Sequence, residues 1–276
     1  MRRAINNAQH ILLYLLLAFG GFLTAWPFLW MMGTAFKSYV EAVEPTLNPF
    51  PKQWHWENVA AVFNAAPFGR YFFNSILVSG TVTCCVILTS VMAGYAFARL
   101  RFRGRNVLFA LVLATMMVPF ELTVVPNFTL IQRLGWYNHY AALIVPWCAN
   151  AFSIFLMRQA FLALPNDYFD AATVDGCGHL RFLIRIATPL VKPVMVTVAL
   201  FAFLGSYNAL LWPLLVTADE SMRVVQVGLT YFRGDFGVRV NLMMCASAIV
   251  ILPAVLLYFV AQRYFVEAAL SAGIKG

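Results

Sequence analysis

Six long stretches of the chain are almost free of charged residues, and charged segments separate them. The stretches span residues 11–36, 71–98, 106–132, 134–157, 193–218 and 240–262. Each holds at least 23 residues, whereas about 20 apolar residues suffice for a helix that crosses a membrane. Their apolar residues run continuously rather than alternating in short segments, which disfavours a membrane β-barrel. The pattern therefore predicts an all-α membrane protein with six transmembrane helices.

The composition narrows the class of protein further. Hydrophobic residues make up 62% of the 276 residues and charged residues 11%, and the mean hydropathy is +0.77. Soluble domains carry about 45–50% apolar and about 25% charged residues. A soluble enzyme, a disulfide-rich secreted domain and a disordered chain are therefore disfavoured. The first stretch is longer than the roughly 7–15 apolar residues of a signal peptide, so we expect it to be a retained transmembrane helix.

The net charge of +8 reflects an uneven distribution of basic residues between the two sides of the membrane. If the six helices alternate in direction, twelve arginines and lysines lie on one side and seven on the other. Basic residues prefer the cytoplasmic side, and the dense run at residues 99–105 carries most of this signal. Both termini are thus predicted to be cytoplasmic. We interpret this basic run either as a signal that sets the membrane topology or as a binding site for anionic lipids. Membrane lipid, and not nucleic acid, is therefore the expected partner.

The chain carries no recognisable catalytic or metal-binding motif. Four of the five cysteines lie in apolar stretches and none has the spacing of metal ligands, so we interpret them as packing residues. The sequence lacks a GxxxxGK[ST] phosphate-binding loop and has no serine–histidine or paired-carboxylate arrangement within the stretches. It therefore predicts no metal, no cofactor and no catalytic residue, and it disfavours an intramembrane hydrolase.

One segment is too long for a turn between the fourth and fifth helices. Residues 163–192 contain a predicted short helix, which Asn166 or Asp167 would cap and Gly176 would end in a left-handed conformation. The apolar face of a predicted second helix comprises Leu180, Leu183 and Ile184. The segment is therefore predicted to form a cytoplasmic helix–glycine–helix element that is offered to a partner in the cytoplasm.

Two groups of polar residues within the membrane are candidates for a solute pathway. Glu121 lies in the third stretch, where a carboxylate indicates a function unless it sits near the outer end of the helix. In the fifth stretch Gly205, Asn208 and Trp212 recur at helical spacing, so they share one face of a continuous helix. Asparagine can bond hydroxyl groups and tryptophan can stack on a sugar, but packing between helices explains the same pattern.

The predicted cytoplasmic element resembles a known motif. Residues 170–193 are similar to the EAA loop of importer-type ABC permeases, whose pattern is approximately EAAxxDGAxxxxxFxxIxLPxxxP. Gly176 lies 100 residues before the end of the sequence, at a distance similar to that in the family. The positions that depart from the pattern are Asp170 in place of Glu, Cys177 in place of Ala and Thr188 in place of Leu. The resemblance implies a transmembrane subunit of an ABC importer.

Further matches extend this resemblance over nearly the whole chain. Residues 207–214, YNALLWPL, resemble the WNxFLWPL stretch of maltose-type second permease subunits, with Tyr207 in place of the usual tryptophan. Residues 117–126 resemble the third helix of that subunit, and residues 262–276 resemble its C-terminal tail, although Ala268 replaces the usual glycine. The resemblance implies a permease of a binding-protein-dependent carbohydrate importer, formed as one transmembrane domain.

The resemblance also implies roles for individual residues. A coupling helix would dock in a groove of a cytoplasmic ATPase, where small alanines allow close approach and Asp170 meets an arginine. The implied ATPase contacts are Phe169, Asp170, Ala171, Ala172, Asp175 and Gly176. The implied contacts of the C-terminal tail with the ATPases are Gly273, Lys275 and Gly276. The implied solute pathway comprises Glu121, Tyr207, Asn208 and Trp212.

The resemblance implies an assembly in a bacterial cytoplasmic (inner) membrane. A second permease of the same family would complete the pore, two copies of an ATP-binding cassette ATPase would bind ATP and magnesium, and an extracytoplasmic binding protein would deliver the solute. The solute would be a sugar, a polyol or a glycerol phosphate, moved by rigid-body alternating access. Half of a secondary transporter is the rival function. It would need a coupling carboxylate or cation site, for which Glu121 alone is a poor candidate.

Overall fold

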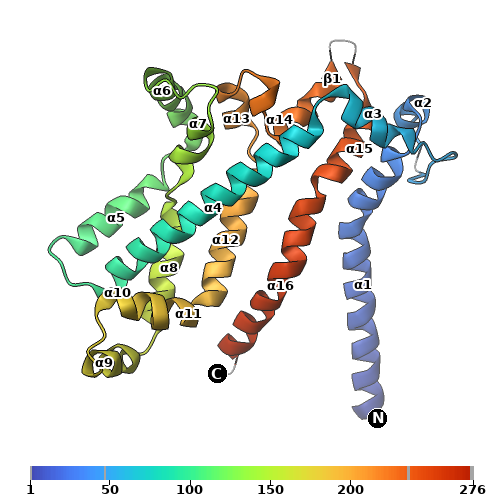
Figure 1. Ribbon diagram of the computed structural model, residues 1–276. Helices are drawn as coiled ribbons and strands as arrows, with labels where there is room; N and C mark the ends of the chain where they lie inside the picture. Colours follow the sequence, from blue (N-terminus) through green and yellow to red (C-terminus); the bar gives the residue numbers. More distant parts are fainter. Residues whose placement is uncertain (1, 47, 235–236, 274–276) are drawn as a thin grey trace. The chain divides into compact units, whose positions relative to one another are not determined.

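Helices build almost all of the chain, in line with its hydrophobic pattern. The computed structural model describes residues 2–46, 48–234 and 237–273 (Figure 1). Within these residues the single sheet is an antiparallel pair of two-residue strands, in which Arg233 lies opposite Val238. The predicted all-α fold is confirmed.

Two compact units divide the chain. The first comprises Met1–Phe68 and Leu229–Leu252, and the second comprises Gly69–Gly228 and Pro253–Gly276. The elements that lie wholly in the first unit are α1 (Arg2–Ala35), α2 (Tyr39–Val43), α3 (Glu57–Ala65), η4 (Thr230–Phe232), β1 (Arg233–Gly234), β2 (Gly237–Val238) and α15 (Val240–Val250). The remaining elements are α4 (Phe68–Arg99), α5 (Arg105–Thr115), α6 (Phe120–Arg133), α7 (Tyr140–Ile144), η1 (Val145–Trp147), α8 (Ala151–Ala163), α9 (Asn166–Val174), α10 (His179–Phe182), η2 (Leu183–Ala187), α11 (Thr188–Leu190), α12 (Lys192–Tyr207), α13 (Leu211–Val216), η3 (Glu220–Met222), α14 (Val225–Leu229) and α16 (Leu252–Gly273).

The structure contains both straight and broken helices of membrane-spanning length. Three helices of the described residues are long and apolar enough to cross a membrane: His10–Ala35 of α1, the whole of α4, and Val240–Gln262 of α15 and α16. Three helix pairs pass the same test but bend at a short break. The bends are 96° between α5 and α6, 40° between α7–η1 and α8, and 82° between α10–α11 and α12. Six spans result when each bent pair counts as one, in agreement with the prediction.

The fourth predicted stretch, residues 134–157, is helical only in part. Gly135 and Asn138 adopt positive φ angles of 69° and 59°, and α7 begins only at Tyr140. The positive φ angles exclude a regular helix at these positions. The third and fourth stretches are nevertheless adjacent, since the link between α6 and α7 is short and α5 packs against α8.

Pro146 explains the break between α7 and α8. A proline has no N–H, so the carbonyl four residues earlier, that of Ala142, loses its helical partner. The Nε1 group of Trp212 donates a hydrogen bond to this carbonyl at 2.9 Å. Helix α8 then starts afresh, because the side chain of Asn150 accepts a hydrogen bond from the backbone N–H of Ser153 at 2.9 Å. Side chains therefore replace the backbone bonds that the break removes.

The fifth predicted stretch, residues 193–218, is also interrupted. Helix α12 ends at Tyr207, and α13 begins at Leu211. In a continuous helix Pro213 could not bond the carbonyl of Ala209, and its ring would clash with that carbonyl. The chain therefore leaves helical geometry between α12 and α13, within a stretch whose composition alone predicts one helix.

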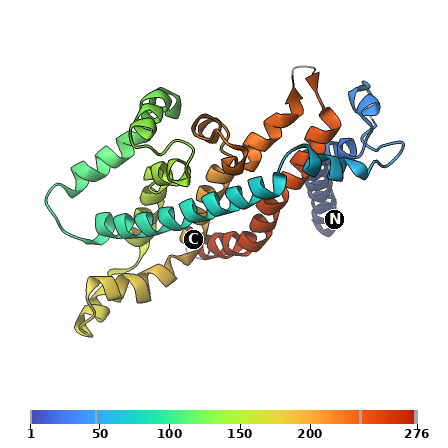
Figure 2. The same cartoon turned by 45° about the horizontal axis from the view of Figure 1, so that its top comes forward.

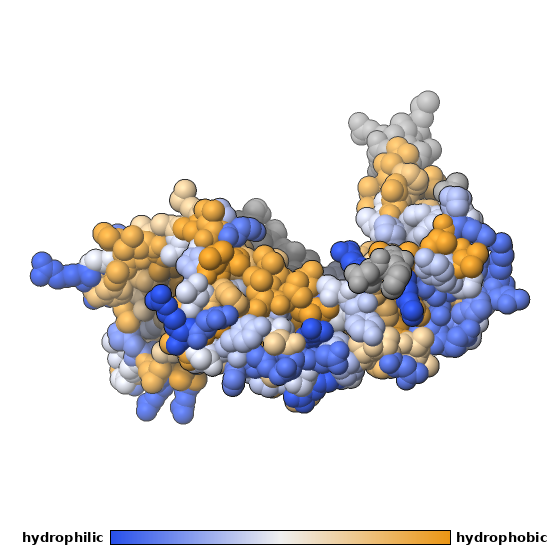
Figure 3. All heavy atoms as spheres, turned by 90° about the horizontal axis from the view of Figure 1, so that it is seen from above, coloured by the Kyte–Doolittle hydropathy of each residue, from blue (hydrophilic) through white to orange (hydrophobic). Residues whose placement is uncertain are grey.

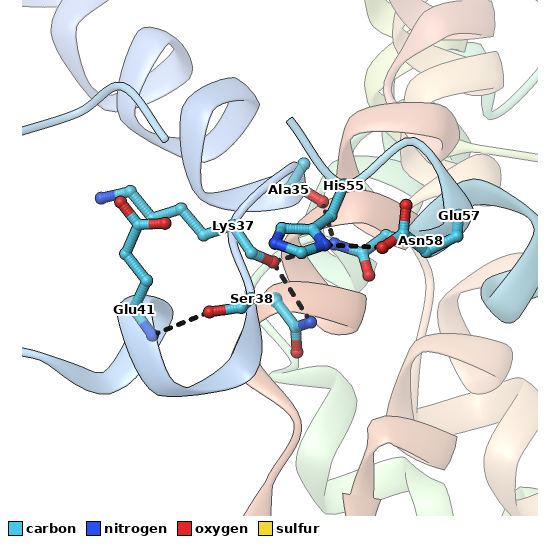
Figure 4. Close-up of polar contacts among 8 residues, drawn as sticks. Ala35, Lys37, Ser38, Glu41, His55, Glu57 and Asn58 are labelled. Carbon is cyan, nitrogen blue, oxygen red and sulfur yellow. Dashed lines mark hydrogen bonds and ion pairs between the residues drawn. The ribbon is translucent and has the colours of Figure 1, made fainter. Parts of the chain in front are cut away.

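In the first unit, the buried side chain of Asn58 holds the end of α1. Its Nδ2 group donates hydrogen bonds of 2.9 Å each to the carbonyls of Ala35 and Lys37 (Figure 4). The buried Lys37 Nζ donates in turn to the carbonyl of Asn48 at 2.7 Å. These bonds satisfy carbonyls that the end of a helix leaves free. Asn58 itself lies in the first turn of α3.

Helix α4 is the central element of the second unit and crosses α8 and α12 (Figures 1 and 2). Near its start lies Asn74, which is fully buried. The Asn74 Nδ2 group donates to the carbonyls of Ser221 and Arg223 at 2.8 Å each, and its Oδ1 accepts from the Tyr140 hydroxyl at 2.6 Å. Near the other end of α4, Gly94 lies directly against α8. The helix is thus fixed by polar contacts at one end and by close packing at the other.

Large apolar side chains cover much of the surface. Hydrophobic residues form broad areas of the face shown in Figure 3, with hydrophilic residues around them. Residues 10–29 of α1 are exposed throughout, and most of them are apolar. In water such a surface would be unfavourable, whereas lipid tails are as apolar as leucine side chains. The exposure pattern therefore agrees with a membrane environment.

Gly94 provides a test of the packing between α4 and α8. A Cβ atom there would lie 2.7 Å from Met157 Cβ and 2.9 Å from the backbone nitrogen of Arg158, whereas a Cβ at Gly80 meets nothing within 4 Å. Alanine favours a helix over glycine by about 1 kcal/mol, so Gly80→Ala should be neutral or stabilising. Gly94→Ala should cost about 1–3 kcal/mol through overpacking. Thermal unfolding of the detergent-purified protein measures both, and equal melting temperatures would contradict the contact.

Candidate functional site

The segment after α8 folds into the expected helix–glycine–helix element, formed by α9 to α11. Helix α9 begins at Asn166, and Gly176 follows it with a φ angle of 71°. The N–H of Gly176 bonds the Thr173 carbonyl at 3.0 Å, and the N–H of Cys177 bonds the Ala172 carbonyl at 2.8 Å. This pair of bonds around a left-handed glycine is a Schellman cap. The predicted role of Gly176 as the end of the first helix is therefore confirmed.

The six predicted ATPase contacts divide between two faces of this element. Phe169 is half-buried, and its ring centroid lies 5.3 Å from those of His179 and Phe182. Ala172 is only 5% exposed and belongs to the hydrophobic core of the second unit. The small size of Ala172 is thus explained by packing within this chain. The members that face solvent are Asp170, Ala171, Asp175 and Gly176.

The second helix presents a different face from the predicted one. Leu183 is buried, but Leu180 and Ile184 are 67% and 62% exposed. A π-helical turn, η2, begins at Leu183, so the ordinary helical period does not continue there. The three side chains that were predicted on one apolar face therefore differ in exposure. We define the outer apolar face of the element as Tyr168, Val174, Leu180 and Ile184, all of which are exposed.

Arg99, at the end of α4, attaches the element to the second unit. Its guanidinium group donates hydrogen bonds to the carbonyls of Phe161 and Leu164, which end α8, and to the Oδ1 of Asn166. A cation favours the C-terminal end of a helix, where carbonyls lack partners. Asn166 therefore receives this bond instead of capping α9, whose N-cap position is occupied by Pro165. The sequence analysis treats Arg99 only as part of a basic run and misses this role.

A second attachment to α4 lies one turn earlier. The hydroxyl of Tyr95 and Nδ1 of His179 are hydrogen-bonded at 3.0 Å. The Tyr95 ring also contacts Phe161 edge-on, with centroids 5.7 Å apart, and His179 stacks on Phe169. The starts of α9 and α10 are therefore tied to the last two turns of α4, so that these parts of the element and α4 pack as one body.

A cavity of about 360 Å³ lies between α4, α8 and α12 within the second unit. Both helix breaks border it, through Ala149 and Asn150 on one side and Ala209 on the other. Its aromatic wall contains Trp147 and Trp212, whose ring centroids are 6.2 Å apart at an interplanar angle of 81°. The cavity thus coincides with the places where the helices are discontinuous, which is where transporters commonly bind their substrates.

Serine side chains supply the polar part of this cavity. Ser75, Ser79, Ser153 and Ser206 all line it. Ser79 is 1% exposed, and its Oγ has no hydrogen-bond partner among the residues that the structure describes. The sequence analysis misses this group, although serines four residues apart on one helix face and an Asn-x-x-Ser cap inside an apolar run were available signals.

Of the predicted pathway residues, the structure brings only Trp212 to the cavity. Gly205 lines the cavity as well, but Asn208 does not. Asn208 lies at the break after α12, where its Oδ1 accepts a hydrogen bond from Gln226 at 3.3 Å. The expected common face of Gly205, Asn208 and Trp212 is therefore wrong, because it assumes a continuous helix.

The other two pathway candidates lie elsewhere in the second unit. Tyr207 is buried, and its ring stacks on Phe203 with centroids 5.5 Å apart. Glu121 is exposed in the first turn of α6, where a carboxylate is favoured by the positive end of the helix. Neither residue lines the cavity, so a role in the pathway stays a prediction for both.

The C-terminal tail is described only in part. Helix α16 continues to Gly273, well beyond the predicted end of the sixth span at residue 262. Lys275 and Gly276 lie outside the described residues. The predicted contacts of the tail with ATPase subunits therefore stay predictions.

Comparison with known protein families gives a match over most of the chain. The family model described as binding-protein-dependent transport system inner membrane component matches residues 86–269. The arabinooligosaccharides transport system permease protein AraQ of Halalkalibacterium halodurans is 32% identical over 279 residues, which covers 100% of both chains. The sn-glycerol-3-phosphate transport system permease protein UgpE of Yersinia enterocolitica is 33% identical and covers 82% of each chain. The diacetylchitobiose uptake system permease protein NgcG of Streptomyces coelicolor is 32% identical over 86% of this chain and 80% of the relative.

Solved structures share the fold. A chain of a bacterial ABC transporter that imports the acidic polysaccharide alginate matches with a TM-score of 0.83 over 94% of this chain and 97% of that chain, at 22% identity. A chain of the alginate transporter in complex with a pentasaccharide-bound periplasmic protein matches with a TM-score of 0.67 over 95% of each, at 14% identity. At these identities the likeness concerns the fold alone.

We expect Arg99→Ala to loosen the attachment of α9 to α4. Hydrogen bonds to a charged group each contribute about 1.5–3 kcal/mol, so local opening of residues 164–176 should become at least about tenfold more frequent. Hydrogen exchange of the purified protein measures this opening. Arg101→Ala is the matched control, because Arg101 is an exposed arginine two residues further along the chain. Equal exchange rates in both variants would show that Arg99 does not hold the element.

Proposed function

The chain belongs to the family of binding-protein-dependent transport system inner membrane components, and we propose that it forms one half of the transmembrane pore of an ATP-driven sugar importer. It is a multi-pass membrane protein with the fold of ABC transporter permeases. Members of this family are transport subunits and not enzymes. The chemistry of ATP hydrolysis then belongs to a separate ATPase subunit, which binds ATP and magnesium.

The observation that carries this proposal is the exposed face of the α9–α11 element. Val174 is 87% exposed, although apolar side chains of this size are usually buried outside a membrane. With Tyr168, Leu180 and Ile184 it forms the outer apolar face defined above. An exposed apolar patch on a well-packed element is typical of a protein interaction site. We assign this face to contact with the ATPase.

The charges beside this face favour a basic partner surface. Asp167, Asp170 and Asp175 are exposed on α9 and at its end. Their carboxylates would pair with arginine side chains, which bind carboxylates in a bidentate manner. Ala171 lies between them and is exposed too, so it permits the close approach of a groove. The docking surface thus consists of outward residues of α9 together with the outer apolar face.

The attachment to α4 supplies the route of coupling. Arg99 and Tyr95 hold both helices of the element against the end of α4. A movement of the docked ATPase would therefore move α4 as a rigid body together with the element. Since α4 lines the cavity, the ATPase and the cavity are connected through one continuous helix. This connection supports alternating access driven from the cytoplasm.

The relatives support a sugar as the solute. AraQ is named for arabinooligosaccharides and NgcG for diacetylchitobiose. We propose a carbohydrate, with sn-glycerol 3-phosphate as the second candidate because UgpE is similarly related. Half of a secondary transporter is disfavoured, since AraQ, NgcG and UgpE are all permease proteins of transport or uptake systems.

The proposed role as one half of a pore implies further protein partners. A second permease of the same family would complete it, two copies of the ATPase would bind its cytoplasmic side, and a binding protein would deliver the sugar. The solved alginate transporter was captured with such a periplasmic protein. The basic run at residues 99–105 favours a cytoplasmic location of both termini in a bacterial cell, where Gly273, Lys275 and Gly276 would meet the ATPases.

Substitutions at Ala171 and Ala172 distinguish an effect on ATPase docking from an effect on the folding of this chain. Ala171→Arg places a large charged side chain on the exposed docking surface, so this chain should stay folded while ATPase affinity falls at least about 30-fold, as for a hot spot of 2 kcal/mol or more. Ala172→Arg forces a charge into the core and should destabilise the chain itself. Co-purification with the ATPase and solute-stimulated ATP hydrolysis measure the first effect, and thermal unfolding measures the second.

Ala171→Ser is the matched control and should retain both the ATPase and its stimulation. The proposed docking surface would be contradicted if Ala171→Arg kept the ATPase bound with normal stimulation of hydrolysis. It would equally be contradicted if Ala171→Arg unfolded this chain to the same degree as Ala172→Arg, because Ala171 would then not be a surface residue.

A further inference from the structure

The cavity in the second unit has an interrupted backbone on two sides. Ala149 and Asn150 belong to the break between η1 and α8, and Ala209 belongs to the break between α12 and α13. Ser79, on the third side, lies about 16 Å along α4 from its start, at 1.5 Å per residue. Non-helical backbone is tolerated at membrane depth only where it is buried in protein or lines a polar cavity. Both breaks border the cavity, so polar contents in it are compatible with this rule.

Ser79 is the unexplained polar group of this cavity. Two of the other serines that border it have partners: Ser75 Oγ accepts from the N–H of Val225 at 2.9 Å, and Ser153 Oγ donates to Asn150 at 3.1 Å. Ser206 is partly exposed. Ser79 Oγ is buried and has none within the described part of the chain. Buried hydroxyls are normally hydrogen-bonded, so a ligand with polar groups is the natural partner of this one.

The aromatic wall offers apolar contact beside the hydroxyl groups. The Nε1 of Trp212 is already bonded to the Ala142 carbonyl, so its ring contributes surface rather than a donor. Trp147 stands nearly perpendicular to it and borders the same space. A ligand that fits must therefore combine hydroxyl groups with an apolar side, as a sugar ring does.

The charge of the lining selects among the possible solutes. All residues that line the cavity in the described structure are uncharged. A phosphate or carboxylate would be an unpaired charge there, which is strongly unfavourable away from water. The volume of about 360 Å³ is near the lower end of the range of about 300–1,000 Å³ for ligand pockets. The space fits a small part of a solute, of the order of one ring.

We propose that this cavity is a subsite for one uncharged, hydroxyl-bearing ring of the transported solute, with Ser79 as a hydrogen-bonding residue and Trp147 and Trp212 as its aromatic wall. The inference rests on the proposed function, and it adds that this subunit itself contacts the solute. It further predicts that the subsite binds neutral sugars or polyols and excludes glycerol phosphate. The competing occupant is water, for which a polar cavity of this size has ample room.

Protection of a cysteine at position 79 tests the proposal directly. The five native cysteines are first replaced, and Ser79→Cys is introduced in the complete importer reconstituted in lipid vesicles. The rate of modification by N-ethylmaleimide is then measured without solute, with arabinotriose, with N,N′-diacetylchitobiose, and with sn-glycerol 3-phosphate. We expect modification without solute, and at least about threefold slower modification with one of the two neutral sugars but not with the phosphate.

Ser90→Cys is the matched control. Ser90 is a fully buried serine of the same helix, its hydroxyl donates to the Ile87 carbonyl, and it does not line the cavity. A cysteine there should react slowly and show no protection. The proposal is overturned if the cysteine at 79 does not react, if neither sugar protects it, or if the phosphate protects it equally. Absence of protection at 79 would leave water as the occupant.

A substitution that leaves the native cysteines in place gives a second readout. Ser79→Ala removes one hydrogen bond and should lower the apparent affinity of the assembled importer for the protecting sugar by about 2- to 10-fold, whereas Ser90→Ala should not. Equal affinities in both variants would contradict a role of Ser79 in binding. ATP-dependent uptake by the unmodified importer tests the proposed function separately, so that a failed subsite is distinguished from a failed transporter assignment.

Discussion

A hydrogen bond from the indole of Trp212 to the carbonyl of Ala142 joins the two broken helices beside the cavity. Pro146 makes this bond necessary, because proline has no N–H group to donate the helical hydrogen bond to the Ala142 carbonyl. Inside a membrane the freed carbonyl has no water to bond, so a side chain from elsewhere in the protein must reach it. The same bond therefore stabilises the break and fixes the position of the Trp212 ring at the cavity wall.

Helix α4 connects the functional regions of the second unit. Its first turns hold the loop before α14 through Asn74, its central part lines the cavity through Ser79, and its last turns hold the α9–α11 element through Arg99. Close packing against α8 at Gly94 keeps this helix in place. A single helix of 32 residues can thus relate the position of the α9–α11 element to the shape of the cavity, with no further moving part.

The sequence predicts the α9–α11 element well but not which of its residues face outward. Gly176 is recognisable because only a residue without a Cβ adopts its left-handed conformation easily. Ala171 and Ala172 are chemically identical, however, and their opposite exposure depends on where the rest of the second unit lies. Leu180 and Ile184 are similarly exposed, although the ordinary helical period places them beside the buried Leu183, where a π-helical turn begins.

The sequence by itself determined the membrane class, the approximate spans and the family, because long apolar runs and local cap motifs depend on nearby residues alone. Only the tertiary structure decided that the fifth stretch is broken, that Asn208 turns away from the cavity, and that Ser79 lies in it without a partner. Those outcomes depend on hydrogen bonds and packing between helices that are far apart in the chain. Hydrophobicity along a single segment carries no information about such contacts, since lipid and protein surroundings are equally apolar.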